Sequence, residues 1–102
     1  MKALVVRRVA ERDAEEARDW YEAEAELGEA FIDELRDAMS RLRTLTERFP
    51  EVRPGIRRSL MNRFPYAIYF SARPDAVVVL AILHQRRGPD TLKHRLSDEE
   101  AV

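Results

Sequence analysis

The sequence predicts an α+β fold with an N-terminal strand, an antiparallel two-helix hairpin and a three-stranded antiparallel meander, the helices packed on one face of the sheet. Apolar residues recur at helical spacing through residues 11–49, and short β-branched and aromatic runs follow between residues 56 and 83. Glycine or proline separates these segments. With 102 residues and 45% hydrophobic content, we expect one domain over residues 1–96 and a disordered tail over 97–102.

The first two elements follow from a change in periodicity near residue 9. Val5 and Val6 are β-branched, which predicts a short strand over residues 3–8. The spacing of three and four residues that follows predicts a helix over residues 11–27, with Ala14, Ala17, Tyr21 and Ala25 on its packing side and Trp20 and Leu27 widening that stripe. Gly28 is expected to end this helix in a left-handed cap.

The second helix has the strongest periodicity in the chain. Its apolar positions alternate in steps of four and three and comprise Phe31, Leu35, Ala38, Leu42, Leu45 and Phe49. Pro50 is expected to stop it. Because the connection at Gly28 is short, the two helices should form an antiparallel hairpin on a sheet. A free-standing coiled coil is disfavoured, since fewer than three heptads precede Pro50.

The second half of the chain reads as strands. Residues 51–55 look like a turn-rich linker before a strand over 56–61. In residues 66–70, Tyr66, Ile68 and Phe70 should share one face, and Ala67 and Tyr69 the other. Residues 77–83 are apolar throughout, which predicts an interior strand buried on both faces. From Gly88 onward we expect one helical turn or a segment along the sheet edge.

Composition excludes several function classes. The chain has no cysteine, which removes disulfides, thiolate metal sites and a cysteine nucleophile, and we expect no metal or cofactor. No apolar run approaches the length of a signal peptide or a membrane span, so a soluble, cytoplasmic protein is expected.

Charge is divided unevenly along the chain. Residues 1–50 carry 9 basic and 13 acidic side chains, whereas residues 51–102 carry 9 basic and 6 acidic ones, within a net charge of −1. A surface on which basic side chains predominate, as expected in the second half of the chain, favours binding of an acidic partner. Solvated helix and sheet surfaces of opposite sign are the alternative interpretation.

Several short motifs occur in an order that resembles the RelE/ParE superfamily of toxins from bacterial toxin–antitoxin modules, and the chain looks closest to the ParE, or plasmid-stabilisation, branch. The resemblance runs from Leu4 to Leu96. Its motifs are Asp19-Trp20-Tyr21, Gly28 with Ala30-Phe31, Phe49-Pro50, Arg57-Arg58, Tyr66-Ala67-Ile68-Tyr69-Phe70, and His84 to Arg87 with Pro89.

This resemblance implies a small toxin that a co-expressed antitoxin holds inactive in a hetero-oligomer. ParE-like members are associated with inhibition of DNA gyrase, whereas RelE-like members cut messenger RNA on the ribosome. We therefore expect a gyrase inhibitor that is not an enzyme, with a ParD-like antitoxin bearing an acidic amphipathic segment. At net charge −1, direct DNA binding by this chain alone is not expected.

The ribonuclease alternative needs a proton donor, a proton acceptor and cations around the phosphate. His84, Arg58 and Arg86 are its candidates, with Arg63 and Arg87 as further phosphate ligands. However, no lysine lies between Lys2 and Lys93, and no tyrosine or phenylalanine follows Phe70. Trp20 and Tyr21 are expected to pack inside, which removes them as a platform for stacking bases.

The residues predicted to contact the target or the antitoxin are Arg57, Arg58, Arg63, Tyr69, Arg86 and Arg87. Simpler roles stay open. In one, His84 ends its strand as a structural histidine; in another, Arg57 or Arg58 pairs with Glu15 or Asp19 in contacts worth about 0–1 kcal/mol. Adjacent Arg86 and Arg87 have no evident structural task. Departures from the family pattern around Gly88, Thr91 and Leu92 also leave open a degenerate, non-toxic protein that still binds antitoxin.

Overall fold

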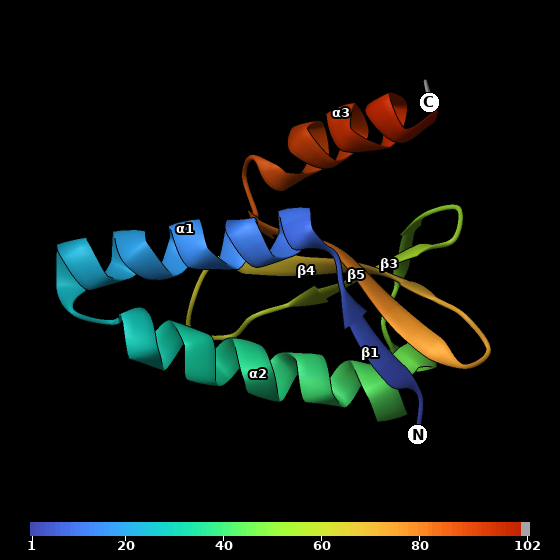
Figure 1. The fold of residues 1–102 in the computed structure, drawn as a ribbon, viewed down its shortest axis with the longest axis horizontal. Coiled ribbons are helices and arrows are strands. Elements are labelled where there is room, and N and C mark those ends of the chain that lie inside the picture. The colour runs from blue at the N-terminus through green and yellow to red at the C-terminus, as the bar shows by residue number, and fades with distance from the viewer. Residues whose placement is uncertain (101–102) are drawn as a thin grey trace.

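The computed structural model describes residues 1–100 and has the predicted order of elements (Figure 1). Strand β1 precedes the helix hairpin, a single 3-10 turn η1 follows it, and four strands and a C-terminal helix complete the chain. The bounds are β1 Ala3–Val6, α1 Arg8–Ala25, α2 Gly28–Thr44, η1 Thr46–Arg48, β2 Glu51–Arg53, β3 Ile56–Leu60, β4 Tyr66–Ala72, β5 Ala76–His84 and α3 Gly88–Glu100.

The five strands form one mixed sheet in the order β1-β5-β4-β3-β2. Strands β3, β4 and β5 are the predicted antiparallel meander, while β1 pairs parallel to β5 from Ala3 opposite Ala76 to Val6 opposite Val79. Parallel neighbouring strands need a long connection, and the chain between β1 and β5, which includes the helix hairpin, supplies it. The predicted interior position of residues 77–83 is confirmed, since β5 lies between β1 and β4 and residues 77–82 are buried.

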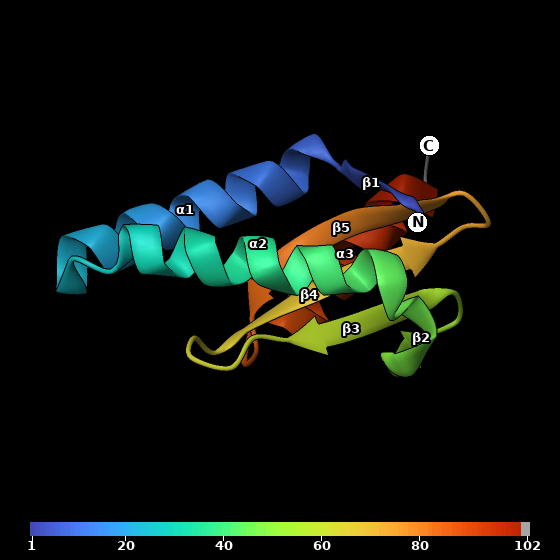
Figure 2. The same cartoon turned by 90° about the horizontal axis from the view of Figure 1, so that it is seen from below.

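The inner face of the sheet, defined as the face that α1 and α2 cover, holds the main core (Figure 2). Ile68 and Phe70 of β4 pack here against the periodic residues of α2, and Tyr66 lies at the margin of the same cluster. The predicted division of β4 into two faces is therefore confirmed, because Ala67 and Tyr69 belong to a second cluster on the opposite side.

The connection between the helices differs from the prediction at Gly28. Glu26, not Gly28, adopts the left-handed conformation after α1, with φ of 56°. Gly28 is instead the first residue of α2, where a Cβ atom would lie 3.0 Å from the carbonyl oxygen of Arg18. The glycine is thus required by the close approach of the helices and not by a turn conformation.

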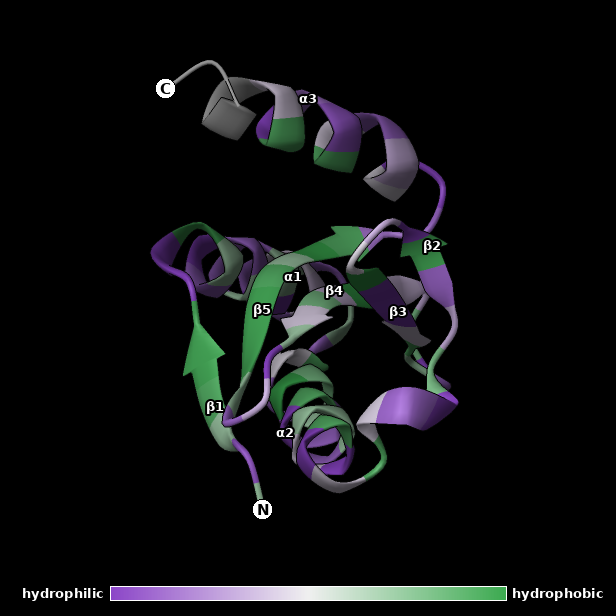
Figure 3. Ribbon diagram, turned by 90° about the vertical axis from the view of Figure 1, so that its right-hand side faces the viewer, coloured by the Kyte–Doolittle hydropathy of each residue, from purple (hydrophilic) through white to green (hydrophobic). Residues whose placement is uncertain are grey.

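The outer face of the sheet, opposite the helix hairpin, is covered by α3 (Figures 1 and 2). Leu92 is buried against this face, and Leu96 packs beside it, so α3 closes a second, smaller core. Figure 3 shows β5, coloured as hydrophobic, running between α3 and α2. Helix α3 runs to Glu100, so it is longer than the single turn that was one of the two expectations for this segment, and it extends into residues 97–102, which were expected to be disordered. Residues 101–102 lie outside the described part.

Two further boundaries were missed around residue 50. Helix α2 ends at Thr44, where the Thr46 hydroxyl donates a hydrogen bond to the Leu42 carbonyl and the chain turns through η1 before Pro50. The expected linker over residues 51–55 contains β2, which pairs with β3 through a turn in which Gly55 has a φ of 77°. Within residues 1–100, no helix is both long and apolar enough to cross a membrane.

Candidate functional site

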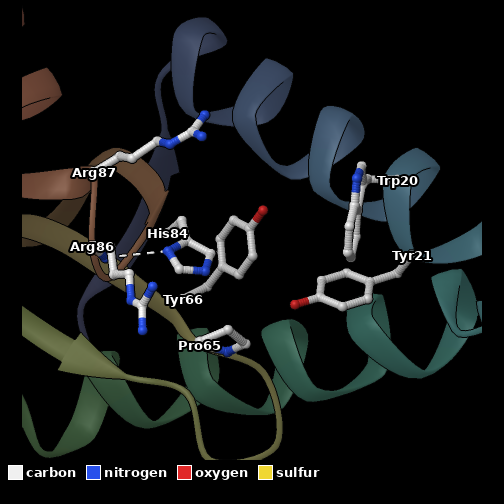
Figure 4. A pocket seen from close by; sticks show the side chains of 7 residues that line it. All are labelled: Trp20, Tyr21, Pro65, Tyr66, His84, Arg86 and Arg87. Carbon is white, nitrogen blue, oxygen red and sulfur yellow. Dashed lines mark hydrogen bonds between the residues drawn. The ribbon is translucent and has the colours of Figure 1, made fainter. Parts of the chain in front are cut away.

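A pocket of about 570 Å³ opens at the end of the sheet where β4 begins and β5 ends, beside the C-terminal half of α1 (Figure 4). Tyr66 and His84 are cross-strand partners on the inner face, and the loops that flank them are joined by a hydrogen bond from the Gln85 N–H to the Pro65 carbonyl, 2.8 Å long. The lining residues are Trp20, Tyr21, Pro65, Tyr66, His84, Arg86 and Arg87.

Aromatic rings form one wall of the pocket. The Tyr66 ring meets His84 edge to face at 5.5 Å between centroids, and Tyr21 stands 5.0 Å from Trp20 and 6.0 Å from Tyr66 in similar geometry. Trp20 is 57% exposed, so the prediction that it packs inside is wrong. Helix α1 extends past the end of the sheet and carries Trp20 beyond the strands that would cover it (Figure 4).

Two exposed arginines form the other side of the pocket, on the short turn between β5 and α3. The turn is held by His84, whose carbonyl accepts the Arg87 N–H and whose Nδ1 accepts the Arg86 N–H, both at 3.1 Å. Because Nδ1 is an acceptor here, neutral His84 carries its proton on Nε2. The histidine therefore has a structural task, as one sequence interpretation proposed, and keeps one free ring N–H.

The environment of the pocket is partly shielded from water. Burial raises the pKa of the Tyr66 phenol above its usual value, with a smaller contribution from nearby Tyr21, while Arg87 opposes the shift. Burial also raises the pKa of Tyr21. Arg87 and the half-buried Tyr66 line the same pocket.

The predicted contact residues do not all gather at this site. Arg63 lies on the loop before β4, where its N–H donates to Glu34 at 2.8 Å and its guanidinium sits 5.6 Å from the centre of the Phe64 ring. That loop is at the same end of the sheet as Arg86 and Arg87, to which the Gln85–Pro65 hydrogen bond ties it. Arg63 is exposed, so these three arginines share one end of the molecule.

Arg57 and Arg58 point to opposite faces of β3. The Arg57 guanidinium donates to the Phe49 carbonyl at 2.7 Å, whereas Arg58 stands opposite Tyr69 on the outer face. Neither bonds to a carboxylate of α1 among the described residues, and Asp19 pairs with Arg18 instead, so the expected pairing with Glu15 or Asp19 is not formed.

Tyr69 does not lie on an accessible surface. It is only 2% exposed beneath the start of α3, and a Cβ atom on Gly88 would come within 2.8 Å of its hydroxyl oxygen. Tyr69 was predicted to contact a partner, but no partner can reach it while α3 covers the outer face. Its hydroxyl has no hydrogen-bond partner among the described residues.

The three ribonuclease candidates are also divided. His84 and Arg86 line the pocket, but Arg58 projects from the outer face of β3 and cannot reach a phosphate held there. Within the described part of the chain, no group of three or more histidine, aspartate or glutamate side chains is arranged to hold a metal ion.

An ionic contact that sequence reasoning missed fixes the elements around the pocket. Asp13 of α1 is 8% exposed and accepts two hydrogen bonds from Arg95 of α3, at 2.6 and 2.7 Å. It also accepts the Ile82 N–H at 3.0 Å. The hydrogen bonds with Asp13 are the main reason that the pKa of Arg95 is raised. An aspartate between Ala10 and Ala17, on the packing side of a helix, was the available signal.

This fold, with a basic pocket lined by aromatic rings at the end of its sheet, defines the molecule as a ParE-like α+β protein. The family model described as "ParE toxin of type II toxin-antitoxin system, parDE" matches residues 4–89, and the chain belongs to this family. Helix α3 lies almost wholly beyond the matched residues.

One solved structure has a similar fold and is described as "Chromosomal ParDE TA system from P. aeruginosa". The TM-score is 0.74 at 19% sequence identity, and the match covers 82% of this chain and 96% of that one. No curated protein sequence is significantly similar to this chain.

Proposed function

We propose that this chain is the toxin of a type II pair, that the free toxin blocks growth by inhibiting DNA gyrase, and that a ParD-like antitoxin neutralises it by tight binding. Membership of the ParE family supports the first statement. The resemblance to the ParE branch supports gyrase as the target. Inhibition then acts through a protein contact and not through a reaction catalysed by this chain.

The separation of the candidate catalytic residues favours this interpretation over RNA cleavage. Attack of a ribose 2′-hydroxyl on a phosphate needs proton transfer and cations gathered at one place. Here Arg58 lies across the sheet from His84, and one nitrogen of His84 is engaged by the backbone of Arg86. What the pocket does present is an exposed pair, Arg86 and Arg87, which suits contact with an acidic surface.

The antitoxin contact is proposed at the same end of the molecule. Arg63, Arg86 and Arg87 form a basic edge there, and an acidic amphipathic segment would meet it with complementary charge. Replacing Arg86 and Arg87 by alanine should weaken the complex with the antitoxin and flatten its dependence on salt. R36A/R41A, which removes the same charge from exposed positions of α2, is the matched comparison and should change little. Unchanged affinity of R86A/R87A at low salt would remove this contact.

The first experiment is to induce the chain alone in a bacterial host and to record growth together with a DNA-damage reporter. Arrest with reporter induction, and inhibition of supercoiling when the purified chain is added to gyrase, are the expected results. The variant R86A/R87A should lose both effects, whereas R36A/R41A, which removes two exposed charges from α2, should keep them.

Other outcomes of that experiment assign the alternatives. Arrest without DNA damage, and with cleaved messenger RNA that H84A abolishes, would replace gyrase inhibition by a ribonuclease function. Normal growth with soluble protein, still bound by antitoxin, would favour a degenerate toxin or a target that is missing from that host.

A further inference from the structure

We propose that the pocket at the end of the sheet binds one unpaired nucleotide of a single-stranded nucleic acid, its base between the aromatic rings and its phosphate on Arg86 and Arg87. The chain binds this nucleotide without cleaving it. The inference concerns the pocket alone and does not rest on gyrase being the target.

The first support is the shape and lining of the pocket. A cavity of about 570 Å³ is within the usual range for sites that take small organic groups. Its wall presents the flat rings of Trp20, Tyr66 and His84, which come from α1, β4 and β5 (Figure 4). A tryptophan that is 57% exposed at the mouth of such a cavity offers a stacking surface to a planar partner, and every base has such a face.

The second support is the position of the cations. Arg86 and Arg87 lie at the pocket on a turn that His84 fixes through two hydrogen bonds, so their backbone is already ordered. A guanidinium matches the oxygens of a phosphate in charge and in geometry. Because Nδ1 of His84 accepts from the Arg86 N–H, the ring presents Nε2–H as a further donor beside them.

The combination favours an unpaired nucleotide over the other ligands that a basic pocket attracts. A base inside a duplex is stacked and paired, so its face is not available to Trp20. An acidic peptide would satisfy the two arginines but would leave the aromatic faces largely unused. A group that is planar at one end and anionic at the other uses both sides of the pocket. Because the contact is local, the net charge of −1 does not oppose it.

The test uses Trp20, which is the single tryptophan of the chain, as its reporter. Short oligothymidylate (DNA) and oligouridylate (RNA) are titrated into the full chain at low salt, and tryptophan fluorescence is followed. Stacking should quench it. The polarisation of labelled oligonucleotides then gives affinities for variants, and thermal melting verifies that each variant is folded. Tighter binding of one oligonucleotide assigns the strand as DNA or RNA.

Loss of the stacking ring in W20A should weaken binding about 5- to 150-fold, and Y66A should act in the same direction. Loss of the phosphate contact in R86A/R87A should reduce the slope of log affinity against log salt by about 0.7, because one phosphate is bound. The control R36A/R41A removes the same charge from α2 and should leave both quantities unchanged.

Three results would overturn the proposal. The first is the absence of quenching by both oligonucleotides at low salt. The second is an equal loss of affinity in R36A/R41A and R86A/R87A, which would show non-specific attraction. The third is equal competition by a duplex of the same sequence or by polyglutamate, which would assign the pocket to charge alone. Gyrase inhibition is read separately by the supercoiling assay, so the failure of either proposal is recognised independently.

Discussion

Replacing Asp13 by alanine should destabilise the fold by about 3 kcal/mol, most of it through a backbone group in β5. Strand β1 ends at Val6 opposite Val79, so it does not reach Ile82. The Ile82 N–H therefore donates its hydrogen bond to the Asp13 carboxylate. A buried N–H that loses its acceptor costs about 1–3 kcal/mol. The lost ionic bond to Arg95 adds about 1 kcal/mol, because that side chain is 25% exposed and returns partly to water.

The assay is urea and thermal unfolding of D13A, D13N, R95M and D13N/R95M. A loss of about 3 kcal/mol lowers the melting temperature of a domain of this size by roughly 15 °C. D13N keeps an oxygen acceptor for the Ile82 N–H and should lose about 1–2 kcal/mol. The double variant should be less affected than the sum of the single ones, because the two side chains share one contact. D19N is the control, since Asp19 forms an exposed pair with Arg18.

Hydrogen exchange of the Ile82 amide separates the two parts of this effect. D13A should expose the Ile82 amide to exchange. R95M should leave the hydrogen bond from the Ile82 amide to Asp13 in place and should mainly loosen the attachment of α3. If D13A costs less than about 1 kcal/mol and the Ile82 amide remains protected, Asp13 does not complete the hydrogen bonding of β5 and the reasoning is refuted.

Three further predictions follow from close contacts and backbone conformation. Gly88→Ala should lower the free energy of unfolding by about 1–3 kcal/mol, because its Cβ would meet the Tyr69 hydroxyl at 2.8 Å. Adding Y69F to G88A should restore most of the lost stability in thermal melting. An unchanged melting temperature for G88A would contradict the contact. Glu26→Gly should stabilise the chain by about 0.5–1 kcal/mol, because it relieves a left-handed residue after α1; lower stability in urea unfolding would be the opposite result. Absorbance titration of tyrosinate, compared with Y66F, should show Tyr66 ionising above its usual pKa of 10.0, and R87A should raise that pKa further because a cation that favours the phenolate is removed. Since the folded pKa is the higher one, the contribution of Tyr66 to stability is complete below the unfolded pKa and is lost as pH rises through the folded one; a downward shift in R87A would argue against the contact.

Much of the fold was predictable because its signals are periodic. The spacing in α2 and the alternation in β4 each indicate one buried face, and both predictions are confirmed. The fully apolar β5 also required cover on two sides. That requirement pointed to an element on the outer face, yet α3 has only Leu92 and Leu96 to bury and gave too weak a pattern to be recognised as a helix.

The site was less predictable because it depends on where elements end in space. Trp20 lies at helical spacing from Ala17, so sequence placed it inside; only the lengths of α1 and the sheet show that nothing covers it. Tyr69 shows the opposite case, since it was predicted to contact a partner but lies on the face that α3 covers. The exposed position of Arg86 and Arg87 was predictable, because two charged residues just beyond the end of a buried strand lie outside the sheet.

The parallel pairing of β1 with β5 joins residues 3–6 to residues 76–79, and this has a consequence for synthesis. As the chain leaves the ribosome, β1 and the helix hairpin appear first and have no strand to hold them until β5 has emerged. Contacts so distant in sequence form late and slowly. His84, Arg86 and Arg87 emerge later still, so a nascent or truncated chain lacks half of its pocket for the same reason that it lacks a closed sheet. The pocket is therefore complete only after Arg87 has left the ribosome.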